Sequence, residues 1–228
     1  DVLAHRQLIF DAIVRYRRMK NRGVVAEYLR GRFDRFSHFA RIGEGSLGGK
    51  GRGIAFVDHI LKKHSVFESI PDVEVRIPKT LVLCTDIFDR FMEDNNLYPV
   101  ALSDAPDESI LEAFLASRLP DELLGDIQTF CEVVTGPVAV RSSSLLEDSH
   151  YQPYAGVYAT YMIPDSSDSA DMARHIADAI KAVYASVYYS GSKAYMSATS
   201  NVIDQEKMAI ILQEVVGDKH GTHFYPHC

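Results

Sequence analysis

The segment that most restricts the fold of this 228-residue chain is a nearly unbroken apolar run over residues 208–216, which Gly217 closes. The run does not alternate between an apolar and a polar face. It therefore predicts a strand that is buried on both sides, at the centre of a sheet. Three further strands are predicted, over residues 80–84, 138–140 and 156–163, and the last of them is expected to pair with 138–141.

Apolar residues at helical spacing predict several helices between these strands. We expect helices over residues 3–20, 24–31, 51–64, 85–95, 107–118, 121–132 and 168–189, and another that begins near Gly191. Polar or glycine-rich loops are expected over residues 37–50, 65–78, 99–108 and 142–153. Helices interspersed with strands, without a regular strand–helix alternation, indicate an α+β fold with a mixed sheet and flanking helices.

The charge is distributed unevenly along the chain. Residues 1–36 carry nine Lys/Arg and four Asp/Glu, whereas the remainder carries fifteen Lys/Arg and twenty-seven Asp/Glu. The basic part has no interleaved stacking aromatics and belongs to an otherwise acidic chain. We therefore interpret it as a solvated helix face, and we expect no nucleic-acid partner.

Composition also restricts the class of protein. No segment approaches 18 consecutive apolar residues, so no membrane association is expected, and no secretory leader is recognisable. The three cysteines are odd in number and far apart, which is typical of buried thiols in a reducing cytoplasm. No metal-ligand spacing of Cys or His is found, although His220, His223 and His227 leave a terminal metal site as an alternative. No arrangement typical of a catalytic nucleophile is present.

A glycine–lysine segment, Gly48-Gly49-Lys50-Gly51, lies directly before the predicted helix 51–64. It is not a Walker A loop, because Gly51 and Arg52 follow Lys50 where Ser or Thr is needed. The N–H groups and the positive dipole at the start of a helix favour an anion, and a lysine there can reach several phosphate oxygens. The alternative is a flexible glycine turn.

A second cationic segment follows the apolar run 138–140, where Arg141 is expected at the strand end before Ser142, Ser143 and Ser144. The planar guanidinium suits phosphate oxygens, so Lys50 and Arg141 together suggest a polyphosphate site assembled from distant parts of the chain. The alternative is an ion pair between Arg141 and Glu147 or Asp148.

Two more segments could contribute to such a site. Gly156 allows a ligand to approach the backbone closely, and Thr160 is expected on the same side of its strand. Gln213 and Glu214 end the apolar run, where their backbone groups could contact an adenine edge. They could equally be plain polar residues of an edge strand.

Six ordered blocks of the sequence resemble the N-terminal nucleotide-binding domain of the phosphoenolpyruvate synthase and pyruvate phosphate dikinase family. They are G-G-K-G, I-P-K-T-L-V-L-C-T-D, V-A-V-R-S-S-S-L-L-E-D-S, Y-A-G-V-Y-A-T-Y, A-V-Y-A-S-V-Y and A-I-I-L-Q-E-V-V-G. The resemblance runs from about residue 36 to residue 228. We therefore expect a basic helical segment over 1–35 and a C-terminally truncated nucleotide-binding domain over 36–228.

The resemblance implies an ATP-grasp-type fold that closes on Mg-ATP. Full-length members use ATP to phosphorylate a histidine on a separate domain, and the phosphoryl group then passes to pyruvate. By position, Lys50 and Arg141 resemble the phosphate-binding lysine and arginine of the family. The remaining matches are Gly156 and Thr160 for the loop over the phosphates, and Gln213, Glu214 and Val216 for the segment against adenine.

The sequence also departs from the family pattern. Val157 stands where the family often has Gln, and the family's metal-binding residues and phosphorylated histidine would lie beyond Cys228. We therefore expect a fragment of an ATP-dependent phosphotransferase that is inactive by itself, with no metal ligands of its own. A non-catalytic nucleotide-sensing module of the same fold, or a related small-molecule dikinase, remains an alternative.

Overall fold

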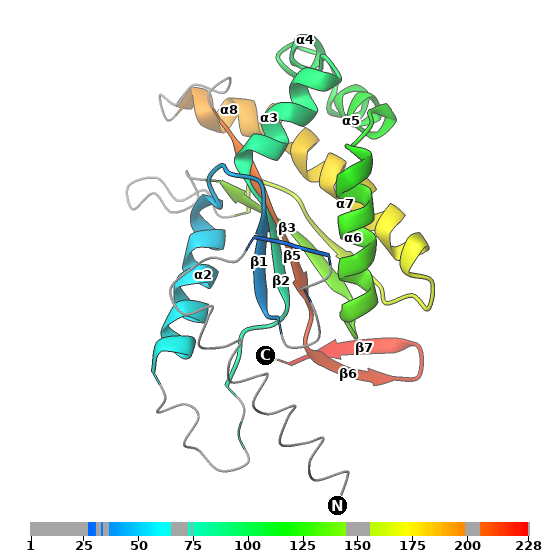
Figure 1. Ribbon diagram of the computed structural model, residues 1–228. Coiled ribbons are helices and arrows are strands. Elements are labelled where there is room, and N and C mark those ends of the chain that lie inside the picture. Colours follow the sequence, from blue (N-terminus) through cyan, green and yellow to red (C-terminus); the bar gives the residue numbers. More distant parts are fainter. Residues whose placement is uncertain are drawn as a thin grey trace, which may run out of the picture.

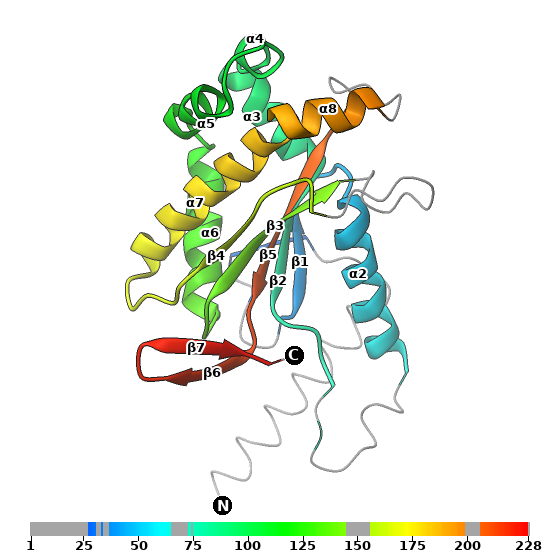
Figure 2. The ribbon, with the colours of Figure 1, turned by 180° about the vertical axis from the view of Figure 1, so that it is seen from behind.

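A computed structural model of the chain describes residues 27–30, 33, 37–64, 73, 75–144, 156–198 and 206–227. These residues form a layered α+β structure, in which α2 covers one face of a mixed sheet and α6 and α7 lie on the other side (Figures 1 and 2). The predicted fold class is therefore confirmed. The five strands of the sheet lie in the order β1-β2-β5-β3-β4. Their bounds are β1 Phe39–Ile42, β2 Thr80–Leu83, β3 Val138–Ser144, β4 Thr160–Ile163 and β5 Met208–Glu214.

Strand β5 lies at the centre of this sheet, although it is the last of the five strands along the chain. It pairs antiparallel with β2 on one side and with β3 on the other, whereas β1 pairs parallel with β2. The residues from Met208 to Leu212 are fully buried, as expected for a strand covered on both faces. The apolar run thus forms the predicted central strand, and β4 pairs with residues 138–141 of β3 as expected.

The helices begin where the local sequence favours it. Helix α7 starts after Asp168, whose carboxylate accepts hydrogen bonds from the backbone N–H groups of Ala170 and Asp171. Helices α5 and α6 each have two acidic residues in the first turn, which stabilise the positive end of the helix dipole. The bounds are α2 Gly48–Lys63, α3 Thr85–Asp94, α4 Tyr98–Ala101, α5 Asp107–Ala116, α6 Asp121–Val133, α7 Ser169–Ser186 and α8 Ser190–Ala198.

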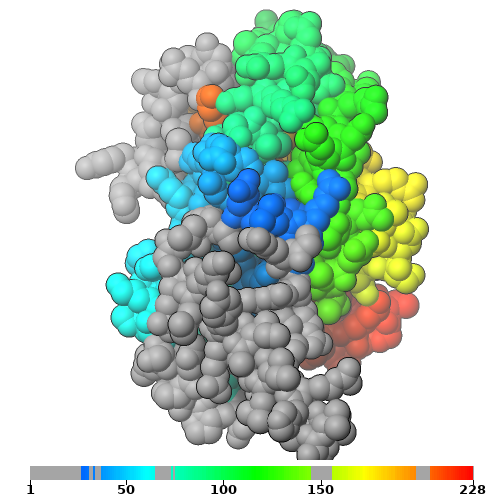
Figure 3. Space-filling model, in the orientation of Figure 1, coloured from blue at the N-terminus to red at the C-terminus, as the bar shows by residue number. Residues whose placement is uncertain are grey.

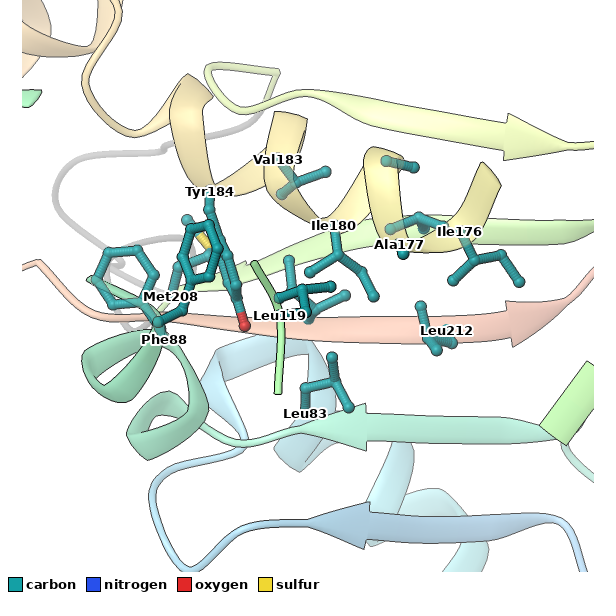
Figure 4. Packing of buried hydrophobic residues seen from close by; sticks show 14 of the residues in the cluster. Leu83, Phe88, Leu119, Ile176, Ala177, Ile180, Val183, Tyr184, Met208 and Leu212 are labelled. Carbon is teal, nitrogen blue, oxygen red and sulfur yellow. The ribbon is translucent and has the colours of Figure 1, made fainter. Parts of the chain in front are cut away.

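The larger hydrophobic core lies between the sheet and α7 (Figure 4). Ile176, Ile180 and Val183 of α7 point toward Leu83 of β2 and Leu212 of β5, and all five side chains are buried. Aromatic rings from α3, α5, α7 and the turn after α7 extend this core beyond the sheet, with ring centroids 5.0 to 6.5 Å apart. These rings belong to Phe88, Phe91, Phe114, Tyr184 and Tyr188.

The core on the opposite face of the sheet is much smaller. It consists of Phe39, Ile77, Val82, Ala209 and Ile211, against which partly buried residues of α2 pack. Within the described residues, the only helix that packs against this smaller core is α2. The polar side chains considered below lie on this face.

Several local predictions are wrong. Residues 27–30 are not helical, because Glu27 forms a β-bridge with Arg41 and the Tyr28 N–H donates to the Arg41 carbonyl. Strand β1 lies inside the predicted loop 37–50, and α2 includes the glycine–lysine segment as its first turn. Residues 142–144 continue β3, whereas 156–159 precede β4 without being part of it. The predicted helix 3–20 lies outside the described residues.

The boundary near residue 36 stays a prediction, but the core does not begin there. Tyr28 and Phe33 are buried, and the centroids of their rings lie 5.1 Å apart. The ring centroid of Phe33 in turn lies 5.8 Å from that of Phe130 in α6. Residues upstream of the predicted boundary therefore contribute to the same core as α6.

A two-stranded hairpin that the sequence pattern does not predict follows β5. Its strands are β6 Gly217–His220 and β7 His223–Pro226, and it lies beneath α6 and α7 (Figures 1 and 3). The Lys219 ammonium pairs with the Asp165 carboxylate at 2.9 Å, which ties the hairpin to the segment before α7. Among the residues described, no helix combines the length and the apolarity that a membrane crossing requires.

Candidate functional site

The start of α2 lies directly against the backbone of β3. Gly48 has a φ of +67°, and a methyl group added to it would lie 1.8 Å from the carbonyl oxygen of Ser143. Only glycine fits a position that combines a left-handed conformation with such a close approach. Gly48 is therefore required for packing the helix start onto the sheet.

Serine hydroxyls bind the backbone of this first helical turn. The buried Ser143 hydroxyl donates to the Leu47 carbonyl at 2.8 Å and accepts from the Gly51 N–H at 2.9 Å. The Gly48 N–H donates to the Ser46 hydroxyl at 3.1 Å. Two N–H groups expected to be available to an anion are thus bound within the protein, which corrects that expectation.

This packing places the Lys50 ammonium beside Ser142 of β3. Its ammonium donates to the Ser142 carbonyl at 3.2 Å and lies 3.4 Å from the Ser142 hydroxyl. Ser142 and Ser143, which the sequence pattern assigns to a polar loop, are instead buried strand residues that orient the start of α2.

Arg141 lies within β3 rather than at its end, since the strand continues to Ser144. Its guanidinium donates to the Gln213 side-chain oxygen of β5 at 3.0 Å, and the Gln213 amide donates to the Thr80 hydroxyl of β2 at 3.2 Å. The three side chains form a polar row across three neighbouring strands. The alternative partners, residues 147 and 148, lie outside the described residues.

A hollow of about 350 Å³ opens between α2 and the sheet. Its polar lining comes from Lys50 of α2, Arg141 of β3 and Gln213 of β5, three residues far apart in the sequence. Its volume is at the lower end of the range of about 300–1,000 Å³ that is typical of small-molecule sites. Two cations beside an apolar wall suit a ligand with an anionic part and a flat apolar part.

The apolar wall is not predicted from the sequence. It consists of Gly53, Ile54 and Val57 of α2 together with Ile77 and Pro78 before β2. The sequence pattern assigns Ile54 and Val57 to the core-facing stripe of a helix, yet Val57 is 47% exposed. The helical periodicity identifies the stripe but cannot show that part of it borders an open hollow.

The other predicted site residues do not line this hollow in the described structure. Thr160 is exposed and pairs directly with Arg141 in the β3–β4 register. Gly156 is exposed in a turn with a φ of +79°, and nothing lies within 4 Å of the position of a Cβ. The turn therefore requires glycine for its conformation rather than for packing.

Glu214 and Val216 follow Gln213 at the end of β5. The Glu214 carboxylate accepts from the Thr135 N–H at 2.7 Å and from the Thr135 hydroxyl at 2.9 Å, so it binds the loop before β3. Val216 is 51% exposed, and its carbonyl accepts from the His227 N–H. The Glu214 N–H is also engaged, because it donates to the Lys79 carbonyl at 2.9 Å.

Within the part of the chain that the structure describes, no group of three His, Cys, Asp or Glu side chains is placed to hold a metal ion. The described lining of the hollow contains no carboxylate. Burial raises the pKa of the Cys84 thiol, and it raises the pKa of the Cys131 thiol to about 12. Both thiols are therefore poor nucleophiles.

Comparison with known proteins identifies the family. Residues 44–224 match the family described as "Pyruvate phosphate dikinase, AMP/ATP-binding domain", and this range includes Lys50, Arg141 and Gln213. The chain is also 29% identical over 140 residues to "Uncharacterized phosphotransferase YvkC" of Bacillus subtilis (strain 168). That alignment covers 61% of this chain but only 16% of the relative. Because the family match extends over most of this chain, the chain belongs to the pyruvate phosphate dikinase AMP/ATP-binding domain family.

Proposed function

We propose that this chain binds ATP in the hollow between α2 and the sheet and serves an ATP-dependent phosphotransferase of the phosphoenolpyruvate synthase type. The observation that supports this proposal best is the meeting of Lys50, Arg141 and Gln213 around one hollow. These residues come from three segments that a nucleotide-binding family shares in this order. The family match supports ATP as the ligand.

Lys50 and Arg141 are proposed to bind the triphosphate and to neutralise charge on the phosphoryl group that is transferred. In phosphoryl transfer the protein contributes mainly positioning and electrostatic stabilisation. Each cation now contacts a neutral oxygen, of Ser142 and Gln213 respectively, and could exchange it for a phosphate oxygen. Thr160, beside Arg141, and the Gly156 turn are proposed to approach the phosphates from the β4 side.

The adenine is proposed to lie toward the end of β5, against the apolar wall. Gln213 borders the hollow, and the backbone of Glu214 and Val216 continues from it. The Glu214 carbonyl and the Val216 N–H can recognise the adenine edge, while Ile54 and Ile77 can contact its faces.

A magnesium ion is expected to accompany ATP, because Mg²⁺ commonly binds substrate phosphates and neutralises their charge. The described residues of the hollow offer it no carboxylate ligand. We therefore assign no metal ligand to this part of the chain. By the family resemblance, the protein ligands would follow residue 228.

We further propose that the intact enzyme phosphorylates a histidine on a separate domain, which passes the phosphoryl group to pyruvate. The family resemblance supports this route, and the small share of the curated relative that this chain matches leaves room for such domains. Two buried free thiols, Cys84 and Cys131, support a cytoplasmic location.

The test is calorimetric titration of the complete protein with Mg-ATP. We expect Lys50→Ala and Arg141→Ala each to weaken binding by about 1.5–3 kcal/mol, because each removes a charged hydrogen-bond donor from the phosphates. Matched controls are Lys63→Ala at the far end of α2 and Arg174→Ala on α7, which remove the same charges elsewhere. Equal affinity of all four variants would refute the proposed site.

A second measurement separates the enzyme from a nucleotide sensor of the same fold. The partly buried Val157 packs against the core where the family often has a polar residue, which favours the sensor. Incubation of the complete protein with ATP labelled in the transferred phosphate should yield acid-labile phosphohistidine. Tight ATP binding without any labelled histidine would favour the sensor.

A further inference from the structure

We propose that Thr85 and Asp86, at the start of α3, form a clamp that positions Lys50 for nucleotide binding. This inference rests on the proposed role of Lys50. The residues belong to a different helix from Lys50 and do not line the hollow. We assign them to positioning rather than to contact with the nucleotide.

The contacts of the clamp lie between the start of α3 and residues 44–46, the loop that leads from β1 into α2. The two carboxylate oxygens of Asp86 each accept one backbone N–H, from Glu44 and from Gly45, both at 2.9 Å. The Thr85 hydroxyl accepts from the Ser46 N–H at 3.0 Å, and the Thr85 N–H donates back to the Ser46 carbonyl at 3.0 Å. Four hydrogen bonds thus fix three consecutive loop residues.

The loop is also shaped to fit these two side chains. A methyl group added to Gly43 would lie 2.5 Å from an Asp86 oxygen, and one added to Gly45 would lie 2.6 Å from the Thr85 hydroxyl. Gly43 moreover has a φ of +97°. The two glycines therefore allow the backbone to approach the clamp closely enough for the hydrogen bonds to form.

The constraint passes from the clamp to Lys50 through two hydrogen bonds and a short stretch of backbone. Ser46 is held by Thr85, and its hydroxyl accepts the N–H of Gly48, the first residue of α2. Lys50 follows two residues later, in the same helical turn. Ser143 fixes the other side of this turn, so the loop clamp and β3 together determine where the ammonium lies.

The Asp86 carboxylate does not cap its own helix. Near the start of a helix, an aspartate is expected to cap its own N–H groups. Here the N-cap residue of α3 is Cys84, no side chain caps the helix, and the Asp86 carboxylate binds another segment. A side chain that leaves its own helix end to hold a neighbouring loop supports a positioning role.

The first experiment measures amide hydrogen exchange in the complete protein without nucleotide. Asp86→Ala should accelerate exchange at residues 44–46 about tenfold, because the loop loses two acceptors and opens more often. The control is Asp89→Ala, one turn further along α3, which removes an ion pair with Lys207 but does not contact the loop. Unchanged exchange at residues 44–46 in Asp86→Ala would overturn the clamp, whatever the protein binds.

The second experiment is a double-mutant cycle for Mg-ATP binding. If Asp86 acts through Lys50, Asp86→Ala should weaken binding about tenfold in the wild-type background and less than about twofold in the Lys50→Ala background. Asp86→Asn, which keeps one acceptor oxygen, should give an intermediate loss and guards against misfolding of the alanine variant. Thermal unfolding of each variant verifies that it folds.

The outcomes separate this inference from the proposed function. If Lys50→Ala does not weaken ATP binding, the phosphate role of Lys50 fails and the clamp has nothing to position. If Lys50→Ala weakens binding but Asp86→Ala does not, or if the two losses simply add, the clamp alone is overturned.

Discussion

At the scale of single residues, two glycines of α2 differ in whether their position tolerates a side chain. Gly48 has a positive φ and approaches the Ser143 carbonyl closely, whereas Gly53 has nothing within 4 Å of the position that an added methyl group would occupy. We expect Gly48→Ala to lower the free energy of unfolding by at least about 2 kcal/mol, because it adds backbone strain and a clash. Urea denaturation measures this change.

Gly53→Ala is the matched control, since it makes the same substitution in the same helix. It should raise the stability by about 0.5–1 kcal/mol, as expected for replacing a glycine inside a helix. Equal losses in the two variants would contradict the assignment of Gly48 to close packing.

At the scale of secondary structure, the stability of α7 depends on its N-cap. Asp168→Ala should lower the free energy of unfolding by about 0.5–2 kcal/mol, because the N–H groups of Ala170 and Asp171 lose their acceptor. Asp178→Ala, on the exposed face of the same helix, loses only a surface pair with Lys181 and should change stability far less. A larger loss in Asp178→Ala, measured by thermal unfolding, would contradict this ranking.

The elements that the sequence predicts correctly are those with a strong local pattern. The apolar runs of β2 and β5 and the amphipathic repeat of α7 are visible without tertiary information. Strand β1 is not predicted because it has only four residues among glycines and serines, and the hairpin is not predicted because its residues are mostly polar and exposed. Buried Ser143 resembles a loop residue until α2 is seen to bind it.

The candidate site is predictable only in part, because some of its features have no local sequence pattern. The pairing of Lys50 with Arg141 follows from the chemistry of phosphate and from the order of the sequence blocks. The apolar wall and the Asp86 contacts depend on how α2, α3 and the sheet pack together, which no local pattern records.

At the scale of the whole molecule, burial of weak acids predicts a loss of stability at alkaline pH. Burial raises the pKa of the Cys131 thiol from 9.0 to about 12 and that of Tyr189 to about 12, and it also raises the pKa of Tyr184. In the unfolded chain these groups ionise at a lower pH than in the folded protein. Their contribution is therefore fully present below about pH 9 and is lost as the pH rises toward about 12.

We expect the free energy of unfolding, measured by urea denaturation between pH 8 and pH 11, to decrease steadily above pH 9. Cys131→Ala should reduce the slope in this interval by up to about 1.4 kcal/mol per pH unit. A stability that stays constant up to pH 11 would show that these groups ionise equally well in the folded protein.

The central position of β5 has a consequence for synthesis on the ribosome. Its pairing with β2 joins residues 133 positions apart, such as Thr80 and Gln213. Until residues 208–214 have emerged, β2 and β3 each have one edge whose backbone N–H and C=O groups lack their β5 partner. The nascent chain therefore completes its sheet late, and a polypeptide that stalls earlier would be prone to aggregate.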